Sequence, residues 1–302
     1  MEEFPGSGIQ TSPCAFPAAL GSLVFGAGEG GFLRRFFESA YPVAGAVVKL
    51  SAIVLTFNEE RNIPDCLAAL SWADERLVVD SGSTDGTLEL AKINGARVVQ
   101  HRFTDFASQR NFAMRQATGD WVFFVDADER VTPALAEEIR SVIRTDAPDP
   151  SAGVGKAAYA IPRDNCFFGK RLRFGDARGD APTRLFPRED VIWTQPVHEK
   201  VETSLPVRKL KHSMLHFSTR DLAHYKEKLR EYLPLELETM VLKGVKPGWK
   251  SFLFRPPAKF FSLYFFKLGI LDGVAGFQYA ILSSYYTAVK HWRLIKLSSR
   301  SR

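Results

Sequence analysis

The sequence predicts an α/β fold in which helices pack on a largely parallel sheet. Between residues 50 and 145, strand-like runs of Val, Ile, Leu and Phe alternate with helix-like segments of about ten residues, joined by short loops. The run WVFFV at 121–125 lacks the alternation of a half-exposed strand, which indicates burial on both faces. Polar side chains follow three of these strands directly. A layered domain with a site along one sheet edge is therefore expected.

The first strand is expected over Ser51–Phe57, and Asn58 is a plausible N-cap for a helix that runs to about Leu70. The later elements are expected in this order: a strand at 76–80, a turn at 81–83, a helix through Ile93 closed by Asn94-Gly95, a strand at 96–100, a helix at 106–117, the strand at 121–125 and a helix from Pro133 to about Ile143. Beyond the loop 145–156, residues 157–217 contain short strand-like pieces such as AAYAIPR, TRLFPR and VRKLKHSMLHF. Asp221–Leu237 has the pattern of a charged amphipathic helix.

Composition bounds the class of protein. The 302 residues are 45% hydrophobic and 25% charged, which is ordinary for a folded soluble chain. Three scattered cysteines, Cys14, Cys66 and Cys166, lack metal-ligand spacing and favour a reducing compartment. The acidic start MEEF argues against a secretory signal. Residues 1–48 are rich in Gly, Ala and Pro and are expected to form a poorly ordered extension.

Three strand ends carry the polar residues. The strands finish in TFNE at 56–59, DSGS at 80–83 and DAD at 126–128. Ligands of open α/β sheets bind outside the carboxyl ends of the strands, so these clusters are expected to form one site. Backbone N–H groups at the helix start after Thr56 favour an anion, and Asp80 is placed to accept hydrogen bonds from a base or ribose. Tight turns and helix caps are the structural alternative.

Asp126, Asp128 and Glu129 place three acids within four positions, and their mutual repulsion requires positive charge or water nearby. A hard divalent cation shared by Asp126 and Asp128, and by phosphate oxygens of a ligand, explains the pattern. The alternative is a solvated strand end in which Asp128 or Glu129 caps the next helix. The cation is the favoured explanation.

The motifs SAIVLTFNEERNIPDCL, VVDSGSTDGT, QRNFA and WVFFVDADE, in this order, resemble inverting family 2 glycosyltransferases of the GT-A fold. The later pieces RDNCFFGKRLRFGD, RLFPR, VHEKVE and LHFSTRDLAHYKEKLREY resemble the subgroup that contains lipopolysaccharide-core β-glucosyltransferases. The likeness covers roughly residues 50–237. It implies a GT-A catalytic domain at 49–217. The extension at 1–48 has no counterpart in the likeness, and the composition of the C-terminal part predicts a helical membrane-associating region at 218–302.

The resemblance implies how the site works. A nucleotide-diphosphate sugar would bind, and Mg²⁺ or Mn²⁺ held by Asp126 and Asp128 would stabilise charge on the departing diphosphate. An acceptor hydroxyl would attack the anomeric carbon from the opposite face, inverting its configuration. The residues expected to bind the nucleotide sugar are Thr56, Asn58, Glu59, Asp80, Ser83, Asp85, Arg110, Asn111 and Asp126.

The reaction needs a carboxylate that takes the acceptor proton. Glu199 in PVHE is the candidate base, although a polar loop whose acid pairs with Lys200 is a serious alternative, and Asp180 is the second choice. His198 and His216 are weaker candidates for contact with the metal or diphosphate. Two arginines in the acceptor half, Arg163 and Arg184, are candidates to bind a phosphorylated or acidic acceptor, with solvated arginines as the alternative.

The C-terminal segment suggests a membrane surface. Leu268–Val289 has about the length of a spanning helix, but Asp272, Gln278, Lys259 and Lys267 interrupt the apolar stretch or its approach. Interfacial helices with a basic end fit better than a span. The alternative is a helical subdomain packed on the catalytic domain. From Lys290 to Arg302 there are five basic residues and no acid.

Together these features predict a peripheral enzyme at the cytoplasmic face of the inner membrane. It would transfer a hexose, glucose by the resemblance, from a UDP-sugar to a lipid-linked saccharide such as lipopolysaccharide core, with no nucleic-acid partner. The alternatives are a polyprenyl-phosphate glycosyltransferase and a catalytically silent membrane-associated scaffold.

Overall fold

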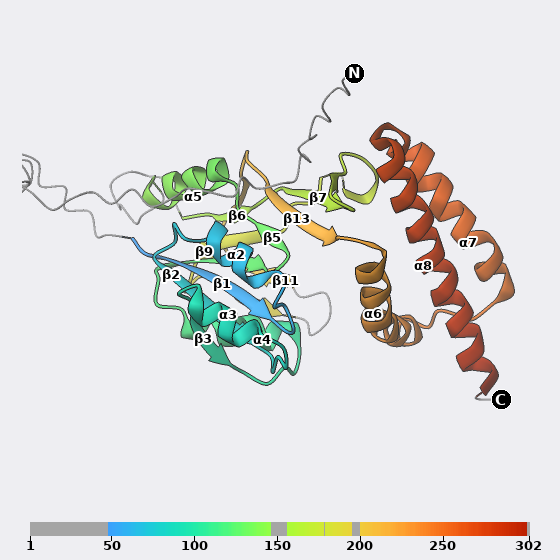
Figure 1. Cartoon of the computed structure of the whole chain (residues 1–302), viewed down its shortest axis with the longest axis horizontal. Helices are drawn as coiled ribbons and strands as arrows, with labels where there is room; N and C mark the ends of the chain where they lie inside the picture. Colours follow the sequence, from blue (N-terminus) through green and yellow to red (C-terminus); the bar gives the residue numbers. More distant parts are fainter. Residues whose placement is uncertain (1–47, 146–155, 178, 195–199, 301–302) are drawn as a thin grey trace, which may run out of the picture.

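The computed structural model describes residues 48–145, 156–177, 179–194 and 200–300. The predicted N-terminal extension therefore lies outside the described residues, except for its last position. The chain forms a layered α/β body and, at one end of it, a group of three long helices (Figure 1). The predicted α/β class is confirmed.

A seven-stranded sheet forms the centre of the body, in the order β12-β6-β9-β4-β1-β2-β3. Its strands are β1 Leu50–Thr56, β2 Glu75–Asp80, β3 Arg97–Gln100, β4 Trp121–Asp126, β6 Ala158–Ala160, β9 Thr183–Pro187 and β12 Val207–Lys209. Strands β3, β2, β1 and β4 run parallel, whereas β9 runs antiparallel to β4 and β6 antiparallel to β9. The parallel half matches the alternating pattern of the sequence, and the antiparallel half comes from residues 157–217.

Helices cover both faces of this sheet. The helices are α2 Ile63–Ala69, α3 Thr87–Ile93, α4 Phe106–Gln116 and α5 Pro133–Thr145. Phe123 packs with residues of α2, α3 and α5 on one face, while its neighbour Phe124 packs with α4 on the other. Both phenylalanines are fully buried, because side chains alternate across a strand that has a helix layer on each side. The apolar run at 121–125 is thus explained.

The register of the parallel strands places the polar strand ends together. Thr56 pairs with Asp80 across β1 and β2, and Leu55 pairs with Asp126 across β1 and β4. The end of β1 therefore lies between Asp80 and Asp126. This is the carboxyl edge of the sheet, and the arrowheads of β1 and β13 point from the body toward α6 (Figure 1).

The piece VRKLKHSMLHF forms two strands rather than one. β12 joins the large sheet, and β13 Met214–Thr219 joins a small sheet with β5 Glu129–Arg130, β7 Arg163–Phe167 and β8 Lys170–Arg171. The chain turns between β12 and β13 because the backbone N–H groups of Lys211 and His212 donate to the Glu138 carboxylate, at 2.8 and 2.9 Å. A separate pair consists of β10 Ile192–Thr194 and β11 Lys200–Glu202.

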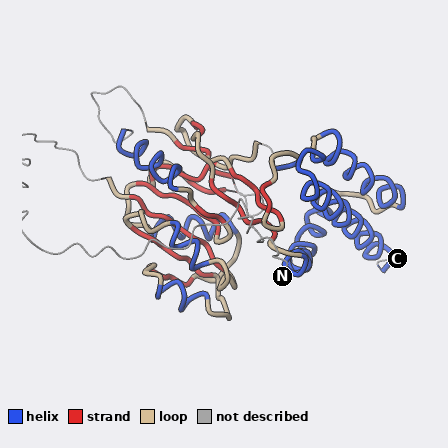
Figure 2. The backbone as a smooth tube through the Cα atoms, turned by 45° about the horizontal axis from the view of Figure 1, so that its top comes forward, coloured by secondary structure: helices blue, strands red, loops and turns tan. Residues whose placement is uncertain are grey.

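Three helices complete the chain: α6 Leu222–Leu242, α7 Trp249–Phe261 and α8 Gly273–Arg300. Asp221 caps α6 by accepting from the His224 N–H at 2.8 Å, and the helix extends beyond the expected end at Leu237. The α7–α8 hairpin folds back on itself through a π-helical turn at 262–266 and a 3₁₀ turn at 269–272. A Cβ on Gly276 would lie 1.9 Å from the Gly269 carbonyl oxygen, so the hairpin requires glycine there. Figure 2 shows the three helices beyond the end of the sheet.

Candidate active site

Asp80 is buried at the end of β2 and is held by its own loop. Its carboxylate accepts from Thr56 Oγ1 at 3.0 Å and from the backbone N–H groups of Gly82 and Ser83, at 2.9 and 2.8 Å. Gly82 has φ of 99°, a conformation that favours glycine and lets the loop wrap around the carboxylate. With 0% of the residue exposed, Asp80 fixes the shape of this loop.

The loops after β1 and β2 are joined by side chains expected to bind the nucleotide. Asn58 N donates to Ser83 Oγ at 2.8 Å, and Asn58 Oδ1 accepts from Thr84 N at 2.8 Å. Asp85 accepts from Glu60 N at 3.1 Å. Glu59 Oε2 accepts from Asn62 Nδ2 at 2.7 Å, and burial raises the pKa of Glu59. The structure therefore brings these residues together as one polar rim.

Asp126 lies among arginines. Arg184 on β9 donates to both of its carboxylate oxygens, with Nη1 at 3.1 Å from Oδ1. Arg110 Nη2 lies 3.6 Å from Oδ1, and Arg163 Nη1 lies 4.0 Å from Oδ2. The Arg110 guanidinium also lies 4.6 Å from the ring centre of Trp193. Burial alone would raise the pKa of Asp126, but Arg184 and Arg110 outweigh it and hold that pKa below its usual range.

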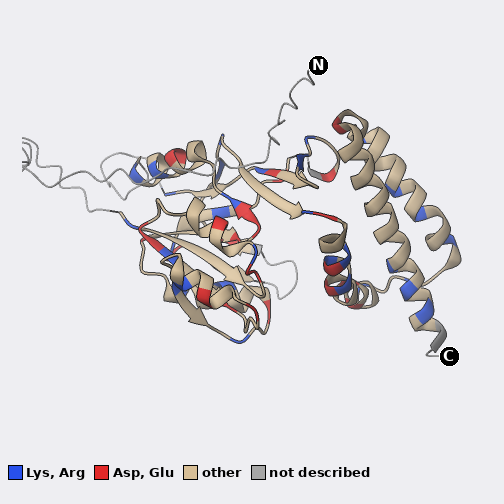
Figure 3. Cartoon of the chain, in the orientation of Figure 1, with Lys and Arg blue, Asp and Glu red and all other residues tan. Residues whose placement is uncertain are grey.

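Glu129 completes this cluster from β5. It is fully buried, accepts from the Asp126 N–H at 2.8 Å, and lies 3.2 Å from Arg163 Nη1. Burial and the neighbouring Asp126 raise the pKa of Glu129. The positive charge expected among the three acids is thus supplied partly by the protein itself. Figure 3 shows acidic and basic segments meeting in this part of the body.

Asp128 has different partners, because it points toward β13 and α6. Asp128 Oδ2 lies 3.1 Å from Lys228 Nζ on α6 and 3.5 Å from His216 Nε2 on β13. His216 Nδ1 lies 2.5 Å from Asn165 Oδ1, and the other ring nitrogen, Nε2, faces Asp128. Against the effect of burial, the hydrogen bond and charge of His216 and the charge of Lys228 lower the pKa of Asp128.

The donor set at Asp128 fits a divalent cation. A carboxylate oxygen and an imidazole nitrogen are ligands that Mn²⁺ accepts, and Mg²⁺ and Mn²⁺ commonly take their remaining ligands from substrate phosphates. Asp126 is bonded to arginines, and no group of three or more His, Cys, Asp or Glu side chains within the described ranges is arranged to hold a metal. The Asp128–His216 pair would therefore hold the ion together with ligand oxygens.

The remaining expected residues are dispersed. Asp180 accepts from Arg163 Nε at 2.8 Å, which links the second-choice base to the arginine cluster. Glu199 and His198 lie outside the described residues, so their roles stay predictions. Asn111 is bonded to the Trp193 backbone in both directions, donating to its carbonyl at 2.8 Å and accepting from its N–H at 3.0 Å. In this conformation Asn111 positions β10 and is not directed at the Asp126 edge.

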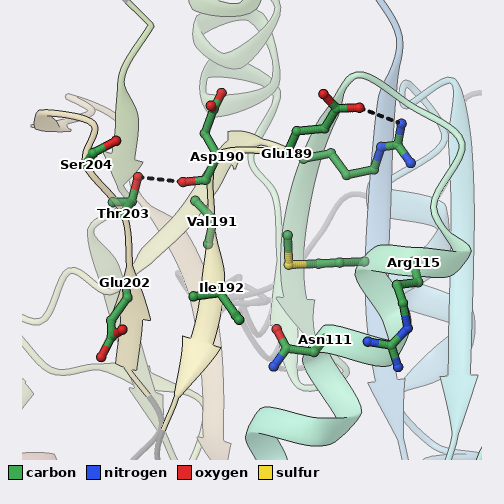
Figure 4. A pocket seen from close by; sticks show the side chains of 11 residues that line it. Asn111, Arg115, Glu189, Asp190, Val191, Ile192, Glu202, Thr203 and Ser204 are labelled. Atoms are coloured by element: carbon green, nitrogen blue, oxygen red, sulfur yellow. Dashed lines mark hydrogen bonds and ion pairs between the residues drawn. The ribbon is translucent and has the colours of Figure 1, made fainter.

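A cavity of about 900 Å³ lies away from the carboxylates. It is bounded by α4 and the β10–β11 pair, with Asn111 and Arg115 on one side and Glu202 and Thr203 on the other (Figure 4). Its far end is formed by the segment after β9, where Arg188 N bonds to the Asp120 carbonyl before β4 begins. This is the amino end of β4, so the cavity does not mark the chemical site. The chemical site is marked instead by the carboxylates at the carboxyl edge of the sheet and by the strand register that brings them together.

The comparison with protein families agrees with this geometry. Residues 51–209, which contain all three strand ends, match the family described as Glycosyl transferase family 2. The chain belongs to glycosyl transferase family 2. As a glycosyltransferase it has relatives over most of its length: it is 29% identical over 262 residues to the lipopolysaccharide core biosynthesis glycosyltransferase LpsC of Rhizobium meliloti, covering 83% of this chain and 94% of that protein.

Other similar proteins are less informative. An uncharacterized glycosyltransferase of Rickettsia typhi, RT0209, is 24% identical over 269 residues, which is 84% of this chain and 89% of that protein. Crystal structures of glucosyl-3-phosphoglycerate synthase from Mycobacterium tuberculosis, including one with Mn²⁺ and UDP, are 23% identical. That structure covers 39% of this chain and 44% of its own, with a TM-score of 0.31, too distant to bear on the site.

Two site residues were not predicted from the sequence. The sequence pattern places Glu129 among the three clustered acids but suggests no role for it beyond a helix cap. Its burial between Arg163 and Asp126 depends on the pairing of β5 with β13. Lys228 lies within the family-like piece LHFSTRDLAHYKEKLREY, seven residues after the N-cap Asp221. The sequence signal that could have identified Lys228 is its position two turns into the helix that follows the strand containing His216.

Proposed function

We propose that this glycosyltransferase moves a hexose, glucose in the first instance, from a UDP-sugar to a lipid-linked saccharide such as lipopolysaccharide core, with inversion. The observation that carries the proposal is the convergence of Asp128, His216 and Lys228 beside the ends of β1, β2 and β4 in a family 2 domain. The likeness to LpsC over 94% of that protein supports the class of acceptor. A GT-A arrangement of the domain belongs to the same proposal.

Each group of polar residues at the carboxyl edge of the sheet has a role in this proposal. The rim formed by Asn58, Glu59, Ser83 and Asp85 would hold the nucleoside, with Asp80 fixing the loop. Asp128 and His216 would hold Mg²⁺ or Mn²⁺, which when bound offsets negative charge on the diphosphate. Lys228 and the arginines around Asp126 add positive charge at the same place. Phosphate oxygens are the natural partners of such a cluster.

The acceptor hydroxyl would approach from the side opposite the diphosphate and lose its proton to a carboxylate, for which Glu199 is the first candidate. Arg163 would then act less as an acceptor contact than as the residue that orders Asp180 and Glu129. Because the acceptor is lipid-linked, the enzyme would work as a peripheral protein at the cytoplasmic face of the inner membrane.

The test is a screen of nucleotide sugars for binding and slow hydrolysis by the purified chain, with and without Mn²⁺. We expect UDP-hexoses to bind more tightly than GDP- or CDP-sugars, and binding to depend on the metal. The Asp128→Asn variant should lose the metal dependence, whereas Glu137→Gln on the exposed face of α5 should behave like the wild type. Binding that is indifferent to both metal and Asp128 would refute the proposed site.

A further inference from the structure

The α7–α8 hairpin exposes large apolar side chains. Along α8, the exposed residues Val274, Phe277, Ile281, Tyr285 and Trp292 are separated by three, four, four and seven positions, which places them on one face of the helix. The turn between the helices adds others, including Phe266, which is 84% exposed, and Leu271 at 63%. An apolar helical face of this length, open to its surroundings, indicates a binding surface.

Charge is segregated onto the same segment. Residues 246–302 contain ten Lys and Arg and a single acid, Asp272, so they carry +9, whereas the whole chain carries +6. The preceding 245 residues therefore sum to −3. The one acid is turned toward the body, where its carboxylate accepts from the backbone N–H groups of Arg173 and Phe174, each at 3.0 Å. The exposed hairpin surface is thus apolar and cationic, which complements an anionic lipid surface.

The hairpin is fixed to the catalytic body at defined points. Lys259 and Lys267 both pair with Asp176, and Gly175 N donates to the Lys267 carbonyl at 3.0 Å. Tyr225 Oη on α6 donates to the Leu282 carbonyl at 2.7 Å. The same α6 carries Lys228 to Asp128. Whatever binds the hairpin is therefore held at a fixed distance from the carboxyl edge of the sheet.

A helical hairpin contacts a membrane either by spanning it or by lying in its interfacial region. The apolar length of the helices and the positions of their cations distinguish these two modes. Within the described residues no single helix passes a length and hydropathy test for spanning, whereas Trp249–Phe266 and Gly269–Ser298, bent by 73°, pass it as a pair. Lys259 and Lys267, in the first arm and at the bend, pair with Asp176 of the catalytic body, so insertion of this arm across a bilayer would carry these charges into the hydrocarbon. Lying in the headgroup region lets these side chains stay hydrated while the apolar residues enter the acyl boundary.

We propose that the α7–α8 hairpin lies in the interfacial region of an anionic leaflet, with the α8 stripe and the turn around Phe266 embedded and the basic residues at the headgroups. This inference deepens the proposed function, since it places the site where a lipid-linked acceptor is presented. The occupant of the surface is the bilayer itself.

The experiment uses the full chain and vesicles of phosphatidylethanolamine with phosphatidylglycerol, compared with vesicles of phosphatidylcholine alone. We expect flotation with the anionic vesicles and at least about tenfold weaker partitioning onto the neutral ones. The double variant Phe266→Glu, Leu271→Glu should bind the anionic vesicles at least about tenfold less. The matched control is Ile93→Glu, which alters a 72% exposed isoleucine on α3 and should bind unchanged.

Depth is measured on the wild type by tryptophan quenching with brominated lipids, so the proposal does not depend on a variant that folds. Trp249 and Trp292 contact each other in the hairpin, with ring centres 5.7 Å apart. Bromines near the headgroups should quench them more than bromines near the chain ends. The reverse order would show that this end of the hairpin inserts deeply and would overturn the interfacial placement. A Phe266→Trp variant reports the depth of the turn, and stronger quenching there by bromines near the chain ends would show a spanning hairpin.

Two further outcomes would contradict the proposal. One is wild-type protein that stays in the aqueous fraction with anionic vesicles. The other is a wild-type dimer that the double variant Phe266→Glu, Leu271→Glu dissociates, because a second copy of the chain would then cover the apolar face of the hairpin. Vesicle binding and UDP binding are measured separately, so a chain that floats but binds no nucleotide sugar would refute the proposed function and not the anchor.

Discussion

Lys228 Nζ lies 3.1 Å from Asp128 Oδ2, the oxygen that His216 Nε2 also approaches. A lysine here offsets the negative charge of the carboxylate. A divalent ion that binds Asp128 and His216 must displace this contact or share the oxygen with it. The ammonium would then be free to bind diphosphate oxygens, so Lys228 is placed to respond to both metal and donor.

The first prediction concerns this competition. Lys228→Met should raise the affinity for Mn²⁺ alone by roughly tenfold, because a positive charge next to the ion is removed at a partly exposed site. The same variant should bind UDP less tightly when Mn²⁺ is saturating. Lys226→Met, on the exposed side of α6, is the matched control. Electron paramagnetic resonance of free Mn²⁺ measures the affinity, and unchanged or weaker Mn²⁺ binding in Lys228→Met would contradict the competition.

The second prediction follows from the lowered pKa of Asp128. A carboxyl whose pKa is lower in the folded chain than its unfolded value of about 3.9 contributes stability above that value, and loses it as the pH falls toward the folded pKa. Asp128→Asn should therefore have a lower Tm than the wild type at pH 6, and the gap should shrink as the pH approaches 3. Melting curves across this range test it. A gap that is constant with pH would show that Asp128 is not stabilised as a charge.

The third prediction tests the arginine cluster. Arg184 is buried, donates to the partly exposed Asp126 carboxylate and lies 3.9 Å from the buried Glu129. Arg184→Ala should therefore cost about 1–3 kcal/mol of unfolding free energy by removing the positive charge that offsets both acids. Arg102→Ala, at an exposed position before α4, should change stability by less than about 0.5 kcal/mol. Urea denaturation gives both values. Equal stabilities would mean that Arg163 and Arg110 hold the acids without Arg184.

The fourth prediction separates the two candidate bases. Glu199→Gln should leave UDP-sugar binding intact and lower turnover by about a hundredfold or more, because a proton acceptor of the same size is lost. Asp180→Asn should act instead through Arg163, to which Asp180 is bonded. If Asp180→Asn reproduces the selective loss of turnover and Glu199→Gln does not, Asp180 is the base. Turnover and donor binding must be measured on each variant.

The parallel half of the fold followed from local patterns. WVFFV at 121–125 has helices on both sides, and strand order around β1 is the arrangement that brings three polar strand ends to one edge. The split of residues 207–219 into β12 and β13 did not follow, because it depends on Glu138 of α5, about seventy residues away, bonding to Lys211 and His212. A local pattern contains no information about that contact.

The site likewise combines features that local sequence patterns predict with features that depend on distant contacts. The sequence singled out Asp126 and Asp128 together as metal ligands, since spacing along one strand suggests shared chemistry. Yet the two carboxylates face different neighbours: Asp126 faces Arg184 from β9, and Asp128 faces His216 and Lys228 from β13 and α6. These partners come from later, non-local pairings. The acids were predictable, and Arg110, Arg163, Arg184 and His216 were expected at the site in other roles. The acid that each of them faces, and the presence of Lys228, were not predictable.

The most direct measurement is transfer by the purified full-length chain from UDP-glucose to truncated lipopolysaccharide core in anionic vesicles, with the new linkage read by NMR. The wild type with Mn²⁺ should form a β-linked product from the α-linked donor. Asp128→Asn should form none while melting as a folded protein at neutral pH, and Glu137→Gln should match the wild type. An α-linked product, or undiminished transfer by Asp128→Asn, would contradict an inverting, Asp128-dependent hexosyltransferase.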